Sequence, residues 1–120
     1  MKNKIAVAIY EASAYEMVQN AKINLDNQGM QIISNNMDEQ SVTHTLPAQI
    51  ENYLNALDYA CSLYFSHDIN QQRFVMMYRN DIQNIFESNV YKDHVSLNSF
   101  INLELFYKLI KATEQKGKAD

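Results

Sequence analysis

The three histidines are the residues of this chain best suited to hold a metal ion or to move a proton. Two of them, His67 and His94, each adjoin an aspartate. They lie at opposite ends of a helix predicted over 69–91, and a rise of ~1.5 Å per residue separates them by roughly 30 Å. His44 could therefore join only one of the two pairs. The sequence has no Cys-x-x-Cys or His-Glu-x-x-His spacing, so we expect no metal site and no cofactor.

The sequence lacks the residues that nucleophilic catalysis by a cysteine or a glycine-rich phosphate-binding loop would need. The single cysteine, Cys61, sits on an apolar helical stripe without a basic neighbour that could lower its pKa. We interpret it as a small core residue. The two glycines, Gly29 and Gly117, stand far apart and cannot form a glycine-rich phosphate loop. Since the sequence forces no carboxylates to converge either, we expect a protein that is not an enzyme.

The composition indicates one helical domain. A chain of 120 residues can bury a core of its own, and two Gly and one Pro are too few for the turns of a β-rich fold. The net charge of -4 comes from scattered residues, and no basic patch suggests nucleic acid. The apolar run 5–10 is too short for a signal-peptide core or a membrane span. We expect a cytoplasmic protein of a bacterium or of a phage-infected cell.

A helical hairpin over 47–65 and 69–91 is predicted to organise the fold. In both arms apolar residues recur at steps of three and four, as on one face of an α-helix. Pro47 suits a first helical turn after a cap at Thr45, and Asp68 is expected to cap the second arm. The break of about three residues between the arms favours antiparallel neighbours.

Two further helices, near 4–28 and 97–113, are predicted to complete the domain. Gly29 is a candidate stop for the first helix, although the apolar residues that follow it leave a longer helix open. The polar stretch 34–46 is predicted to be a connecting loop, and the tail 114–120 is expected to fray. The whole chain is thus expected to form a single all-α domain, a four-helix up-down bundle.

The segment 78–86 resembles the Arg-Asn-x-x-x-His signature of HEPN-domain ribonucleases. Arg79 and Asn80 match the signature, whereas Asn84 stands in place of its histidine. The resemblance implies a small helical dimer related to RNA-cleaving toxins. Because an amide cannot act as a general acid or base near neutral pH, it implies a catalytically degenerate relative. The alternative is that Arg79 pairs along its own helix with Gln83 or with a carboxylate.

The stretch Leu54–Glu87 resembles helical hairpins found in small bacterial and phage proteins. This resemblance implies an all-α fold and no activity. Together with the missing catalytic signatures, it favours a non-enzymatic protein-interaction module, an accessory or inhibitor protein that docks on a larger complex. A homodimeric scaffold is the other non-enzymatic possibility.

The predicted helix 97–113 carries apolar residues on more sides than one core contact can cover. We therefore expect exposed apolar area on the first and last helices, and such area marks an interface. Tyr15 and Tyr59 fall off the main stripes and, with Phe106, are the predicted aromatic anchors. The partner, self or foreign, is expected to be a protein. The alternative is a last helix buried deep in the core.

Overall fold

Four α-helices account for most of the chain that the computed structural model describes. The described residues are 3–35, 39–88, 91, 94–95 and 100–119, with side chains described outside 28–46 and 116–119. The helices are α1 (Lys4–Asn35), α2 (Glu39–Phe65), α3 (Gln71–Glu87) and α5 (Ile101–Ala119). The predicted all-α fold is confirmed, and no strand occurs in these residues. None of the described helices combines the length and the apolar character that a membrane span requires.

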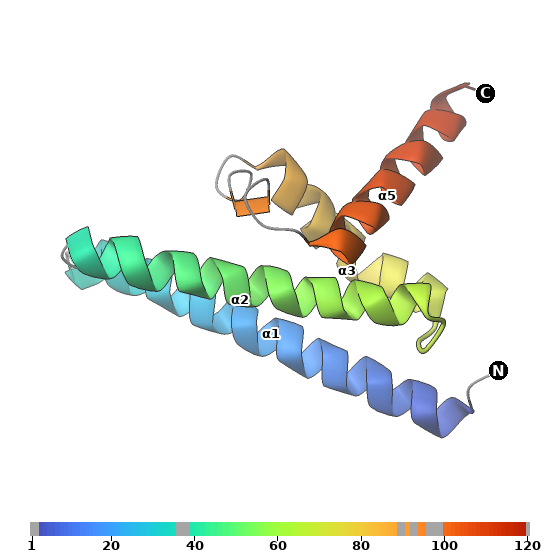
Figure 1. Cartoon of the computed structure of the whole chain (residues 1–120), viewed down its shortest axis with the longest axis horizontal. Helices are drawn as coiled ribbons and strands as arrows, with labels where there is room; N and C mark the ends of the chain where they lie inside the picture. Colours follow the sequence, from blue (N-terminus) through green and yellow to red (C-terminus); the bar gives the residue numbers. More distant parts are fainter. Residues whose placement is uncertain (1–2, 36–38, 89–90, 92–93, 96–99, 120) are drawn as a thin grey trace.

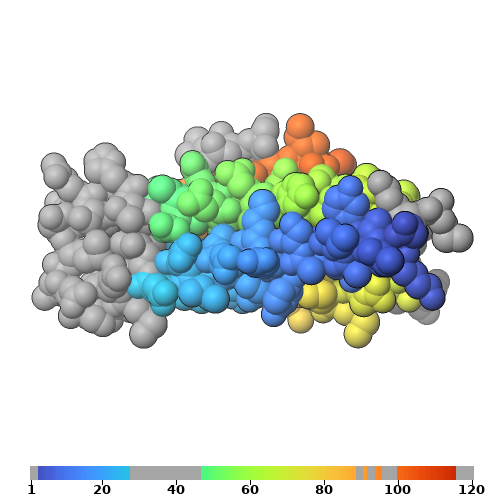
Figure 2. Space-filling model, turned by 90° about the horizontal axis from the view of Figure 1, so that it is seen from below, coloured from blue at the N-terminus to red at the C-terminus, as the bar shows by residue number. Residues whose placement is uncertain are grey.

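Helix α2 is the element around which the others are arranged. It contacts α1, α3 and α5. In Figure 1, α1 runs antiparallel alongside α2 over most of its length, while α5 leaves α2 at a steep angle and its C-terminal end projects outward. Figure 2 shows α1 lying across one face of the molecule, between α2 and part of α3. The predicted arm 47–65 therefore has its longest pairing with α1 rather than with α3.

The core lies where the apolar sides of all four helices meet. The buried face of α2 is broad because apolar residues follow one another at steps of one, three, three and one: Tyr53, Leu54, Leu57, Ala60 and Cys61 are all buried. Helix α1 contributes small or medium side chains such as Ala14 and Val18, which suits a close approach of two helices. The stripes of α3 and α5 close the core: Phe74, Tyr78, Ile82, Ile85, Leu103, Phe106 and Ile110.

The link between α2 and α3 is a tight turn that ends one helix with a left-handed residue. His67 has a φ of 60°, and its N–H donates to the carbonyl of Tyr64, while the N–H of Asp68 donates to that of Leu63. This is the Schellman pattern, in which glycine is the usual residue at the left-handed position. Asp68 is not the cap that the sequence suggested, because its carboxylate accepts from the Ser66 hydroxyl at 2.7 Å. The cap of α3 is Asn70, whose side chain accepts from the Arg73 N–H at 2.9 Å.

Two of the predicted boundaries need correction. The loop predicted over 34–46 is wrong in extent, because α1 continues through Gly29 to Asn35 and α2 begins at Glu39 with Pro47 inside it. Polar composition alone does not distinguish a loop from a polar helical segment, in which the backbone hydrogen bonds form within the helix. Pro47 removes one N–H from the α2 ladder, and its ring crowds the carbonyl of the preceding turn.

The C-terminal boundary also differs from the expectation. Helix α5 continues to Ala119 instead of ending near residue 113, and Glu114 is tied to α3 by hydrogen bonds from Arg79 and Gln83. Its start lies at Ile101, where the carboxylate of Asp58 on α2 accepts from the Leu103 N–H at 2.9 Å. A carboxylate at this position satisfies a free N–H of the first turn and faces the positive end of the helix dipole.

Candidate functional site

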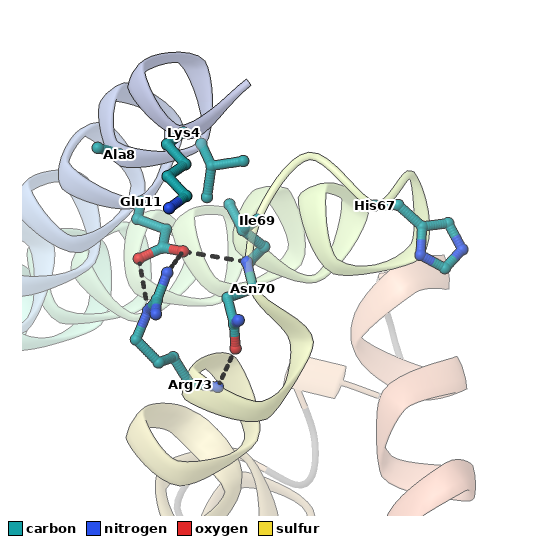
Figure 3. A pocket seen from close by; sticks show the side chains of 8 residues that line it. Lys4, Ala8, Glu11, His67, Ile69, Asn70 and Arg73 are labelled. Carbon is teal, nitrogen blue, oxygen red and sulfur yellow. Dashed lines mark hydrogen bonds and ion pairs between the residues drawn. The ribbon is translucent and has the colours of Figure 1, made fainter. Parts of the chain in front are cut away.

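A hollow lined by described residues lies between the start of α1 and the start of α3 (Figure 3). Its volume is about 620 Å³, and its lining comprises Lys4, Val7, Ala8, Glu11, His67, Ile69, Asn70 and Arg73. At its centre the Glu11 carboxylate accepts from two of the three guanidinium nitrogens of Arg73, Nε at 3.1 Å and Nη2 at 2.8 Å. It also accepts from the Asn70 N–H at 3.0 Å. The polar centre of this cavity is therefore already neutralised by groups of the chain itself.

The polar contacts in this cavity are structural, and we call the contacts of Glu11 with Asn70 and Arg73 the clasp. The hydrogen bond from Arg73, opposed by partial burial, lowers the pKa of Glu11, and a lower pKa makes this carboxylate a weaker base. His67 lines the rim, but Figure 3 shows its ring pointing away from the Glu11 cluster. The carboxylate joins α1 to the N-terminus of α3 and thereby fixes where α3 lies.

The residues considered for metal binding or thiol chemistry are not assembled into a site. Among the described side chains, no group of three or more His, Cys, Asp or Glu could hold a metal ion. The side chain of His44 lies outside the described ones, as does Asp93, the neighbour of His94. Cys61 is completely buried, as predicted for a core residue, and burial raises the pKa of its thiol.

The residues of the ribonuclease-like signature lie on α3, where Asn80 and Asn84 share a face but Arg79 does not lie on it. Arg79 is half-buried and its Nη2 contacts Glu114 of α5 at 3.2 Å. Asn80 and Asn84 are exposed. Five residues along an α-helix correspond to about 140° of rotation, so Arg79 and Asn84 lie on different sides of α3. The expected pairing of Arg79 with a carboxylate is found, although the carboxylate belongs to another helix.

Phe106 is a core residue. The prediction that it anchors a partner at the surface is therefore wrong. Its side chain is 0% exposed. Its ring makes edge-on contacts with Tyr64 and Phe74, at centroid distances of 5.2 and 5.0 Å. The reason is the rotation of α5. One side of α5, together with Phe100 just before it, faces the core: Leu103, Phe106 and Ile110 are buried there. The residue before each of Phe106 and Ile110, Leu105 and Leu109, faces outward.

The two predicted tyrosine anchors lie at the surface. Tyr15 is 47% exposed and Tyr59 is 38% exposed. They belong to α1 and α2 respectively, and neither lies on α5. Tyr15 also contributes to raising the pKa of Tyr78, after the larger effect of burial, to about 12. The structure therefore leaves both rings accessible without joining them to one site.

The outward side of α5 carries a continuous apolar row, which we call the α5 stripe. Ile101, Leu105 and Leu109 follow one another at steps of four and are 64%, 48% and 42% exposed. Residues four apart on a helix are surface neighbours. Exposed apolar area on the last helix was expected from the sequence, and the stripe identifies which residues form it.

The α5 stripe borders an apolar groove between α3 and α5. This groove has a volume of about 240 Å³ and is lined by Tyr64, Val75, Arg79, Phe106, Leu109, Ile110 and Thr113. A neighbouring hollow shares Tyr64 and Val75 with it and extends to Met76, which is 84% exposed. One apolar surface therefore runs from the exposed Met76 side chain through the groove to the α5 stripe. Tyr64 and Val75 link Met76 to the groove, and Leu109 links the groove to the stripe. The sequence reasoning missed the part contributed by α3.

A polar network holds α5 in the position that exposes this stripe. Lys111 donates to Glu87 at 2.6 Å and lies 3.5 Å from Glu114. Hydrogen bonds from Lys111 and from Arg79 lower the pKa values of Glu87 and Glu114 respectively. Next to them, the Phe86 and Tyr107 rings stack at 4.4 Å. These contacts join α3 to the side of α5 away from the stripe, so the stripe cannot turn inward without breaking them.

In comparisons with known proteins, no family model, curated protein or solved structure matches the chain.

Proposed function

We propose that this chain is a non-enzymatic, cytoplasmic protein-interaction module that binds its partner through the α5 stripe and the adjoining α3–α5 groove. The observation that carries the proposal is the row of Ile101, Leu105 and Leu109, exposed in a helix whose other side is packed in the core. Contiguous apolar area of this kind on a small domain marks a binding site more often than isolated apolar residues do.

The surroundings of the stripe support a binding surface over a catalytic one. The groove contains one charged side chain, Arg79, and its guanidinium is engaged by Glu114. An apolar hollow beside a helical row of aliphatic side chains suits an amphipathic helix laid into a groove. In the other hollow, around Glu11, the Glu11 and Arg73 charges pair with each other.

A photoreactive residue placed at position 109 tests this proposal. The matched control carries the same residue at position 20, where Asn20 is exposed on α1. After irradiation of cells that produce each variant, we expect an adduct from position 109 and none from position 20. Mass spectrometry identifies the adduct, and the purified components must reproduce it. No adduct at 109, or equal adducts at both positions, contradicts the proposal.

A further inference from the structure

The charged residues beside the α5 stripe point to what binds there. Glu104 and Lys108 are exposed and lie four residues apart on one flank of the stripe. Neither takes part in an ion pair among the described residues, whereas Lys111 and Glu114 on the inner side of the same helix are both paired. An acidic and a basic residue at this spacing form a self-complementary pattern, because reversing the helix direction exchanges their positions.

We infer that the α5 stripe binds the α5 stripe of a second copy of this chain, with the two helices antiparallel about a two-fold axis between residues 105 and 106. This inference rests on the proposed function and names its partner. In a two-fold contact each surface patch meets its own copy. The flank that carries Glu104 and Lys108 therefore meets the same flank in reverse order. Each Glu104 then faces Lys108 of the other copy, so two identical ion pairs form.

The apolar residues fit the same arrangement. With the axis between residues 105 and 106, the two Leu105 side chains lie beside each other next to the axis, and each Ile101 lies near Leu109 of the other copy. Leu109 also lines the α3–α5 groove, so Ile101 of the second copy reaches the mouth of that groove. The stripe is thereby covered along its length, with an apolar centre and charged residues at its edge, as is usual for protein interfaces.

Access to the stripe does not require the domain to change shape. The core side of α5 holds Leu103, Phe106 and Ile110, while the stripe on its other side is exposed. Figure 1 shows that α5 leaves α2 at a steep angle. A second helix can approach this side while the Glu87–Lys111 pair remains in place. Among the described groups, no like charge beside the stripe opposes the approach, since its flank carries one residue of each sign.

Charge reversal tests the inference by sedimentation of the full chain from low micromolar to millimolar concentration. Glu104→Lys alone, and Lys108→Glu alone, each replace two attractive contacts by two repulsive ones. We expect each change to raise the dimer dissociation constant on the order of tenfold. An equimolar mixture of the two variants should recover dimers, because each variant then faces the opposite charge. Glu16→Lys on α1 makes the same change of charge away from the stripe and should leave the dimer intact.

The possible outcomes separate this inference from the function on which it rests. Recovery of dimers in the mixture supports the two-fold α5 contact, since a merely structural effect of either substitution would not be rescued. A parent dimer whose single variants remain fully dimeric, or whose mixed variants stay monomeric, overturns the inference. A parent that is monomeric throughout also overturns it, while an adduct with a different protein from position 109 leaves the proposed function standing. Absence of both dimer and adduct removes both proposals.

Discussion

Truncation of Phe106 tests whether α5 is rotated as described. Phe106→Ala removes a ring that is 0% exposed and that contacts Tyr64 and Phe74 within 5.2 Å between centroids. Such truncations cost about 3–5 kcal/mol, because apolar contacts are lost and a cavity remains. For a domain with roughly 5–15 kcal/mol of stability, the loss is a large fraction. The neighbouring Leu105→Ala, on the exposed stripe, should change the stability by less than about 1 kcal/mol.

Urea denaturation followed by circular dichroism measures both variants. With a urea dependence of roughly 2 kcal/mol per molar, a loss of about 4 kcal/mol lowers the midpoint by about 2 M. The measurement belongs at low protein concentration, where association contributes little to the apparent stability. A Phe106→Ala midpoint equal to that of Leu105→Ala would refute the assignment of Phe106 to the core. It would instead favour the surface anchor predicted from the sequence.

Three further predictions concern the core, the clasp and the thiol. Leu57→Ala or Ile82→Ala, both at 0% exposed positions, should lower the free energy of unfolding by about 2–5 kcal/mol; a loss below about 0.5 kcal/mol in a urea melt would place either residue off the core. The pKa of Glu11 is lower in the folded chain than its ordinary value, so its contribution to stability is present above the unfolded pKa of about 4.3 and is lost as the pH falls through the folded pKa. Glu11→Gln should therefore flatten the loss of stability on acidification in pH-dependent melts, and an unchanged pH profile would contradict the clasp. Cys61 is buried and its thiol pKa is raised, so a thiol reagent should modify it only at the rate of unfolding, whereas fast modification of the folded chain would contradict its burial.

Local patterns were sufficient to predict the helices but not their ends. The steps of three and four on α2 and α3 predicted two helices correctly, since burial of one helical face leaves that spacing in the sequence. The start of α3 was missed because Asp68 and Asn70 are both good caps, and the choice depends on the turn at His67. The start of α5 depends on Asp58, 45 residues earlier in the chain. A cap supplied from another helix has no local signal.

The candidate surface was predicted in part. The prediction that part of the apolar surface of the last helix stays exposed is confirmed, but Phe106 was assigned to the exposed side and is buried. A signal that could have separated the two sides is the pair Glu104 and Lys108, because charged residues flank the side that faces solvent. The clasp could not be predicted, because Glu11 and Arg73 are 62 residues apart and meet only once α1 and α3 are packed.

The most direct measurement asks whether the chain associates through α5 or through another exposed apolar face. Leu105→Asp and Ile23→Asp place the same charge at positions of similar exposure, 48% on α5 and 52% on α1. Solution mass at matched concentration, with circular dichroism as a check of the fold, compares the two. We predict that Leu105→Asp leaves the helices intact and abolishes association, while Ile23→Asp changes neither. Loss of association from Ile23→Asp with Leu105→Asp unaffected would contradict the account.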